Sequence, residues 1–299
     1  KDGFVNVSMQ YKNVDATSRS VQRGDAQGLI DAGNTFVANP VQVWGAPEIN
    51  DDITLFANAG LDLGNGGEAY MFGNYSERDV RGGFYYRNPT NRPQVFSNDG
   101  GESLLVVDLT DVGNGGVGGC QNIPLSGLNY QQIDSAVQAL PDNCFTFFSM
   151  FPGGFTPNFG GNITDTSLAI GTKGEFKSGF AEGILYDFSG VVGRSESTFQ
   201  LFNSVNASLG PETPTDFEAG RYIQLEKTFS ADFVKFVPAG LYEDLTVAFG
   251  TQWTEESFEI VAGEQASWEV GPYVNQGLSN GSNGFPGFQP QTAGISTRR

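Results

Sequence analysis

The sequence of 299 residues contains no histidine, and it has only 16 lysine and arginine residues against 34 aspartate and glutamate residues. The formal net charge is therefore −18. The lack of histidine excludes zinc and iron sites that depend on imidazole, and it excludes catalysis by His-containing triads or dyads. The shortage of basic residues argues against a nucleic-acid partner, because binding to phosphates requires a basic surface. We predict no enzyme, no cofactor and no metal site.

Long apolar runs are also missing. The longest purely aliphatic run is Leu104 to Val107, whereas a membrane-spanning helix needs about 20 apolar residues. The chain does not open with a basic segment followed by an apolar one, so we expect any secretion signal to have been removed or to lie upstream. Yet the hydrophobic share of 38% is too high for a disordered chain. The composition predicts a folded protein without membrane-spanning helices.

Only two cysteines are present, Cys120 and Cys144, and both lie in a region rich in Gly, Asn and Pro. Neither belongs to a CxxC motif, which disfavours a metal or redox site. Two alternatives remain: a disulfide bond, or two partly buried thiols. In an oxidising compartment the disulfide would close a loop of about 25 residues and contribute roughly 3 kcal/mol. We favour the disulfide.

The dominant pattern in the sequence is period two, the spacing that places alternate side chains on opposite faces of a β-sheet. In residues 221–233, for example, Ile223, Leu225 and Phe229 alternate with Gln224 and Thr228. Comparable segments recur along the chain, and they predict about seven antiparallel strands: 5–12, 52–61, 68–79, 165–173, 183–193, 221–233 and 244–254.

Short and long connections alternate between these strands. The short ones are 62–67, 174–179 and 234–241, and the long ones are 13–50, 80–163, 203–218 and 262–299. Loops beyond about 15 residues are uncommon in compact soluble domains. Short turns at one end of the sheet and long loops at the other are typical of a transmembrane β-barrel, with periplasmic turns and extracellular loops. A secreted β-sandwich remains the alternative, because periodicity does not distinguish lipid from a protein core.

One helix is predicted inside the longest loop. Residues 129–140 place Ile133, Val137 and Leu140 on one helical face, and Pro141 ends the pattern. We expect this helix to pack the loop down.

Several stretches, taken in order, resemble the barrel of TonB-dependent outer-membrane receptors. They cover most of the chain: Val43 to Ile49, Leu55 to Ala59, Tyr70 to Arg78, Gly82 to Pro89, Phe151 to Pro157, Val205 to Pro211, Glu255 to Gly263 and Gly281 to Phe288. Receptors of this family carry an N-terminal plug domain, an energy-coupling box and a barrel of about 22 strands. Residues 1–299 show neither plug nor coupling box, so they resemble an internal fragment of the barrel that forms an open, partial barrel.

The resemblance implies a function in the bacterial outer membrane. The family takes up scarce solutes such as siderophore-bound iron, cobalamin or oligosaccharides without bond chemistry. The implied partners are outer-membrane lipid, the TonB energy-coupling protein, which would act through the plug, and a small-molecule or oligosaccharide ligand. A secreted all-β carbohydrate-binding module is the second hypothesis. A hydrolase using Asp51–Asp52 or Glu255–Glu256 is a distant third, because adjacent carboxylates on a strand point to opposite faces.

Aromatic and arginine side chains on the long-loop side are the candidate ligand-binding residues. Aromatic faces stack on sugar or chelate rings, and arginine holds anionic groups. The alternative role is anchoring at the membrane interface or packing of loop on loop. The candidates are Trp44, Arg78, Arg81, Tyr85, Tyr86, Arg87, Phe155, Phe159, Phe285 and Phe288.

Overall fold

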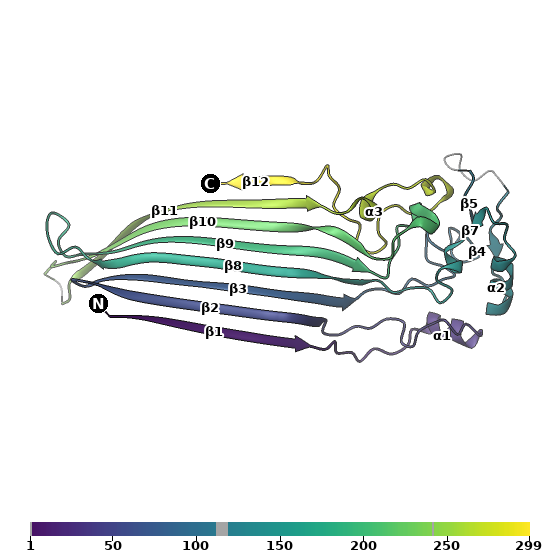
Figure 1. Ribbon diagram of the computed structural model, residues 1–299, viewed down its shortest axis with the longest axis horizontal. Helices are drawn as coiled ribbons and strands as arrows, with labels where there is room; N and C mark the ends of the chain where they lie inside the picture. Colours follow the sequence, from purple (N-terminus) through teal and green to yellow (C-terminus); the bar gives the residue numbers. More distant parts are fainter. Residues whose placement is uncertain (1, 112–118, 241) are drawn as a thin grey trace.

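The computed structural model describes residues 2–111, 119–240 and 242–299, and it consists of one long sheet with a folded cap at one end (Figure 1). The sheet has eight antiparallel strands, each hydrogen-bonded to its neighbours in chain order. Their bounds are β1 Gly3–Val14, β2 Glu48–Gly64, β3 Gly67–Gly83, β8 Asn158–Glu175, β9 Ile184–Phe202, β10 Phe217–Val237, β11 Leu245–Ala262 and β12 Gly294–Arg298.

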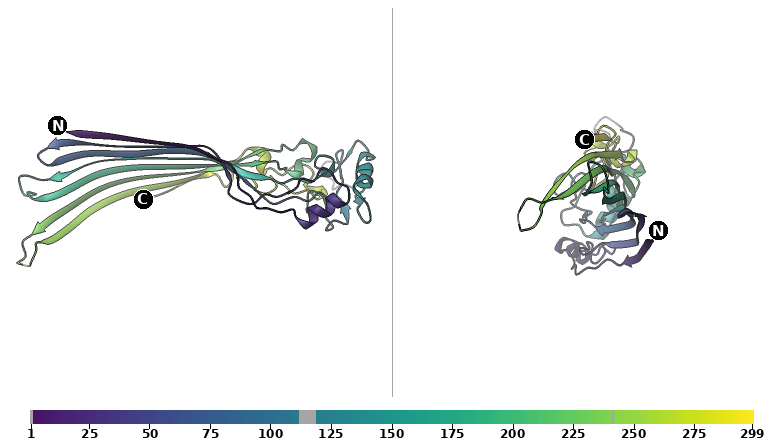
Figure 2. Two further views of the ribbon diagram at one scale, coloured as in Figure 1. Left: turned by 90° about the horizontal axis from the view of Figure 1, so that it is seen from below. Right: turned by 90° about the vertical axis from the view of Figure 1, so that its left-hand side faces the viewer.

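The sheet is curved and open. Figure 2 shows its long strands bending together, and β1 and β12 form the two free edges. The prediction of an antiparallel all-β fold is confirmed at this level, but the sheet in residues 1–299 does not close into a barrel. A soluble sandwich would need a second sheet packed on the first. The described residues add only two small two-stranded sheets, both within the cap.

The seven predicted strands correspond to the seven long strands, but most of the observed strands are longer. The strand predicted at 221–233, for instance, spans Phe217–Val237. The extensions were missed because the chain near the long connections carries polar residues on both faces. The eighth strand, β12, was also missed, since it lies in the predicted loop 262–299. It pairs over only five residues, Glu256 to Ile260 of β11.

The short turns follow from local conformation. Between β2 and β3, Asn65 and Gly66 both have positive φ, at 55° and 79°. An Asn-Gly pair with positive φ at both positions forms the turn whose twist matches that of the flanking strands. This turn needs only two residues, so β2 and β3 form a tight hairpin at the end of the sheet opposite the cap (Figure 1).

The strand register separates the side chains into two faces, which we call the apolar face and the polar face. One row across the apolar face consists of Val5, Ala59, Met71, Ile170, Gly190, Phe229 and Trp253. One row across the polar face consists of Ser8, Phe56, Asn74, Ser167, Gly193, Glu226 and Glu256. In β3, where the sequence did not indicate which side chains face which way, Met71 and Tyr75 share the apolar face.

The long connections fold together into the cap, made of the described residues of 15–47, 84–157, 203–216 and 263–293 (Figure 1). Its core holds Phe96, Phe147 and Phe148, each at most 1% exposed. The cap contains α1 Gly24–Asp31, α2 Tyr130–Gln138, α3 Gln265–Trp268, the 3₁₀ helices η1 Phe147–Ser149, η2 Ala207–Glu212 and η3 Val274–Gln276, and the strand pairs β4 Ser103–Leu104 with β6 Ile123–Pro124 and β5 Val107–Asp108 with β7 Cys144–Phe145.

The predicted helix in the longest loop is confirmed as α2. The side chain of Asn129 accepts a hydrogen bond from the backbone N–H of Gln132, and the side chain of Gln132 accepts one from the backbone N–H of Asn129. This reciprocal capping satisfies two backbone donors. Ile133 and Val137 are buried in the cap core, as the spacing predicted. Helix α1 was missed, because Gly24 and Gly28 weaken its helical propensity and no side chain caps its start.

A disulfide bond joins Cys120 and Cys144, whose Cα atoms lie 5.6 Å apart. Cys144 lies in β7 and pairs with Asp108 of β5. Asn143, the residue before Cys144, donates a hydrogen bond from Nδ2 to the Asp108 carboxylate at 3.0 Å. The disulfide therefore ties the segment around Cys120 to the strand pair at the tip of the cap.

Replacement of Cys120 and Cys144 by Ser should loosen the cap and leave the sheet intact. Loss of a link between residues 24 apart in sequence removes about 3 kcal/mol of stabilisation through the entropy of the unfolded loop. Hydrogen exchange measured by mass spectrometry should show faster exchange in Val107, Asp108 and Phe145, with the amides of β8 to β10 unchanged. Unchanged protection in β5 and β7 would contradict this role.

Candidate functional site

A band of exposed apolar side chains crosses the apolar face. On each long strand one residue marks the limit of the band toward the cap, and the next residue of that face is polar, for example Lys227 after Phe229. Ile223 and Leu225 lie beyond Lys227 as isolated apolar residues. From β1 to β11 the limiting residues are Tyr11, Ile53, Tyr75, Leu168, Val192, Phe229 and Trp253.

The limit of the band moves in one direction along the register from β1 to β11. Trp253 on β11 stands in the same row as Val5 on β1, whereas the limit on β1 is Tyr11, six residues farther toward the cap. The limit shifts by two residues at three of the six steps between strands and stays in register at the other three, an average of one residue per step. An average shift of one residue is about 3.3 Å along the strand, and neighbouring strands are about 4.8 Å apart. The strands are therefore inclined by roughly 35° from the direction perpendicular to the edge of the band.

The end of the sheet opposite the cap shifts in the same direction. The β8–β9 ladder ends at Leu185, which pairs with Val234 of β10. The β10–β11 ladder ends three residues farther from the cap, at the pair of Val237 and Leu245. On β11 the band runs from Leu245 to Trp253. Leu245 and Trp253 are eight residue steps apart, which at an inclination of roughly 35° correspond to a height of about 22 Å. The two edges of the band, which we call the strip, therefore shift in the same direction across the sheet.

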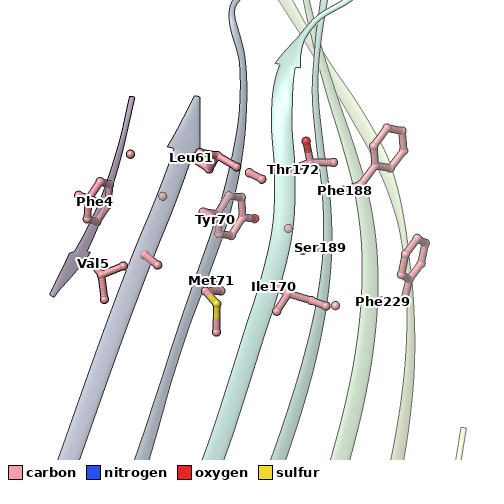
Figure 3. Close-up of a pocket in the computed structure, with 16 residues that line it drawn as sticks. Phe4, Val5, Leu61, Tyr70, Met71, Ile170, Thr172, Phe188, Ser189 and Phe229 are labelled. Atoms are coloured by element: carbon pink, nitrogen blue, oxygen red, sulfur yellow. The ribbon is translucent and has the colours of Figure 1, made fainter. Parts of the chain in front are cut away.

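No other described part of the chain covers the strip. Val7 is 71% exposed, Ile170 54% and Phe249 53%. Figure 3 shows part of the strip, an open hollow of about 860 Å³ whose lining comes from β1 to β10. Small residues such as Ala59 and Gly190 lie between larger ones such as Met71 and Phe229. Contiguous exposed apolar surface of this extent marks an interaction site.

The polar face has a different chemistry. Near its middle, side chains from β3, β8, β9 and β10 line a shallow polar hollow, and Ser167 Oγ donates a hydrogen bond to Asn74 Oδ1. The three basic residues of this face on β1 to β11 each have an acidic partner: Lys12 with Asp52 at 3.2 Å, Arg78 with Asp165 at 3.8 Å and Lys173 with Glu68 at 3.5 Å.

The remaining carboxylates of the polar face include two pairs that lie directly opposite each other. Asp187 of β9 faces Asp232 of β10, and Glu226 of β10 faces Glu256 of β11. Asp187 accepts a hydrogen bond from Tyr70 Oη at 2.7 Å. Like charges directly opposite on adjacent strands destabilise a sheet. Lys173 of β8 lies opposite Asp187, yet none of these four carboxylates forms an ion pair within 4.0 Å among the described residues, so negative charge accumulates on the polar face between β9 and β11.

Three of the predicted ligand-binding residues come together where the cap meets the sheet. The rings of Phe159 and Phe285 lie 4.8 Å apart, and Phe288 stacks on Tyr222 at 4.8 Å. Phe199 contacts both Phe285 and Phe288. Tyr222 and Phe199 are strand residues of the polar face, so the cap folds over that face. The sequence did not identify Tyr222 and Phe199 as candidate site residues, because their period-two spacing indicated only that they belong to strands.

Trp44 and Tyr85 form an exposed pair, with ring centroids 5.0 Å apart and both side chains about half exposed. Tyr86 and Phe155 are instead buried in the cap. Tyr86 Oη donates to the Gly153 carbonyl at 2.7 Å, and burial raises the pKa of the Tyr86 hydroxyl. Of these four predicted residues, only the first two present a surface that a solute can contact.

The three predicted arginines do not converge. Arg78 pairs with Asp165 on the polar face. Arg81 lies over the ring of Phe202 at 4.2 Å. Arg87 is 4% exposed and lies inside the cap. A shared anion site made of these three side chains is therefore not formed, because their backbone positions point them in different directions.

The acidic pairs do not form catalytic dyads. Glu255 lies on the apolar face and pairs with Lys227 and Arg299, whereas Glu256 lies on the polar face. Asp52 is occupied by Lys12. Within the part of the chain that the structure describes, no group of three or more acidic or cysteine side chains could hold a metal ion.

Comparison with protein-family models, with curated proteins and with solved structures gives no match for this chain. In residues 2–111, 119–240 and 242–299, none of the helices has the length and apolar character needed to cross a membrane.

Replacement of Asp232 by Asn should stabilise the sheet, because it removes the repulsion with Asp187 and keeps the shape of the side chain. The expected gain is about 0.2–1 kcal/mol, measured by chemical unfolding at neutral pH. Asp165→Asn is the matched control, since it removes the partner of Arg78 and should give no gain. Equal effects of the two substitutions would contradict the repulsion.

Proposed function

We propose that this chain forms part of the β-barrel of a TonB-dependent outer-membrane receptor that takes up a scarce solute. The observation that carries the proposal is the inclined apolar strip, because its geometry is the one a bilayer imposes on crossing strands. Bacterial barrels have strands tilted by about 35–45° and an outward apolar band about 25 Å tall. The average inclination of roughly 35° and the height of about 22 Å are close to both values.

The occupant of the strip is then the hydrocarbon of the outer membrane. A soluble protein would cover seven strands of exposed apolar side chains with a second layer. No described residue supplies that layer, and charged residues border the strip on the cap side, among them Glu77, Arg194 and Glu255. This arrangement also weakens the alternative of a secreted carbohydrate-binding sandwich, whose core would require a facing sheet.

The polar face would line the interior of the barrel. The cap lies over the polar face through Phe285 and Phe288, as expected for extracellular loops that fold inward over a lumen. The short turns, such as Asn65-Gly66, would then face the periplasm. The energy for uptake would come from TonB acting through a plug domain within the lumen.

Ligand capture would take place on the outer surface of the cap. Trp44 and Tyr85 are the best candidates, since their exposed rings meet at 68° and leave faces free to stack on a sugar or chelate ring. Siderophore-bound iron, cobalamin and oligosaccharides all fit this mode of contact. The chain binds and admits the solute, and no bond is made or broken.

Neighbouring residues at the middle of the strip on β2 provide a test of membrane insertion. Ala57 is exposed on the apolar face, and Asn58 lies on the polar face. An arginine facing the middle of the bilayer costs about 2–4 kcal/mol. Ala57→Arg should therefore reduce the folded, heat-modifiable form in outer-membrane fractions, whereas Asn58→Arg should assemble like wild type. Equal assembly of both variants would oppose insertion.

Uptake is tested separately by deleting the gene and limiting one nutrient at a time. Growth should fail on one solute class, ferric chelates, cobalamin or an oligosaccharide, and should be restored by the wild-type gene but not by Ala57→Arg. Trp44→Ala with Tyr85→Ala should raise the solute concentration needed for growth while the protein still assembles. Normal growth of the deletion strain on every class would remove the proposal of uptake.

A further inference from the structure

Among the residues that the structure describes, Arg87 is a buried cation without an acidic partner. It lies just after β3, where its backbone N–H and carbonyl both pair with Phe155. Its Nε donates to Asn283 Oδ1 at 2.6 Å, and its Nη1 donates to the Tyr85 carbonyl at 3.1 Å. The side chain is 4% exposed. All its hydrogen-bond acceptors among the described residues are neutral.

A second guanidinium converges on the same point. Arg92 Nη2 lies 3.4 Å from Asn283 Oδ1 and donates to it, and Arg92 Nε is buried without an acceptor in the described part of the chain. Two positive side chains thus share one amide oxygen. Arg92 remains partly exposed, so its side of the pair borders solvent.

The electrostatics of this pair are unfavourable as they stand. Burial and the charge of Arg92 lower the pKa of Arg87 to about 10, and burial also lowers the pKa of Arg92. Among the described residues, neither arginine has a carboxylate within 4.0 Å. The chain has 34 acidic residues, so acids are plentiful elsewhere. A buried charge without a partner is costly, and the cost falls when an anion is bound.

The backbone allows a close approach at this point. Gly284 has φ at 125°, and a Cβ placed there would lie 3.4 Å from Arg87 Nη2 and 3.3 Å from the Phe84 ring. The glycine therefore leaves the guanidinium room beside the C-terminal loop. Ser204 Oγ donates to the Asn283 carbonyl at 2.6 Å and holds this loop in place.

We propose that Arg87, Arg92 and Asn283 form a binding site for an oxyanion, either a carboxylate or a phosphate group. Guanidinium groups present paired N–H donors that match the oxygens of both groups. The site joins the loop after β3 to the loop after β11, residues 196 apart in sequence. A bound anion would therefore fasten two loops of the cap to each other. This inference does not depend on membrane insertion or uptake.

Thermal unfolding of the purified protein in detergent tests the site. Sodium phosphate and sodium acetate are titrated separately, with sodium chloride added to keep the ionic strength constant. The Tm should rise with the logarithm of the concentration of one of the two anions, because a ligand that binds the folded state stabilises it. The anion that acts identifies the group. A Tm unaffected by both anions would overturn the proposal.

Two variants make the test specific. Arg92→Gln should abolish the anion-dependent rise, whereas Arg81→Gln, whose parent side chain lies over Phe202 outside the site, should retain it. Loss of the response in both variants, or in neither, would overturn the assignment.

Asn283→Asp provides a test that does not rely on removing an arginine. A carboxylate at this position would supply the missing negative charge at 2.6 Å from Arg87 Nε and 3.4 Å from Arg92 Nη2. This variant should therefore have a higher Tm than wild type in buffer without oxyanions, and its Tm should no longer respond to them. A lower Tm, or an unchanged anion response, would contradict the site.

Discussion

An uncovered apolar surface is the constraint on which the rest of the structure depends. Removal of apolar area from water is the dominant favourable term in folding, yet the strip from β1 to β11 leaves large side chains such as Ile170 and Phe249 about half exposed. An apolar environment outside the chain, as proposed above, would satisfy this surface. The alternation of the strands, the short turns at one end and the charged border at the other are all consistent with such an environment.

The cap solves a different problem, the burial of long connections. Connecting segments carry backbone groups that must be paired, and here four of them share one core around Phe96, Phe147 and Phe148. Hydrogen bonds between distant segments, such as Asn34 to Pro152, hold the segments together. The cap covers the polar face only at its end, through the aromatic contacts of Phe285 and Phe288. The strip on the other face is left free.

Charge is distributed as unevenly as apolar surface. Basic residues on the polar face of β1 to β11 are all paired, and the carboxylates left over face one another between β9 and β11. In the cap the imbalance is reversed, with Arg87 buried and Arg92 partly buried around a neutral amide. Both are places where the chain by itself does not compensate its charge. The polar face between β9 and β11 and the cap are thus the regions where polar partners have most to contribute.

The sequence by itself determined the class of fold, because period-two alternation is a local property that survives without tertiary contacts. It located all seven long strands and helix α2. The ends of the strands and the whole of β12 were not predicted, since polar residues on both faces of a strand give no periodic pattern. The tertiary structure alone decided the inclination of the strip, which depends on register between strands far apart in sequence. It also decided the convergence of Arg87 with Asn283, because no spacing in the chain records which loop a side chain will meet.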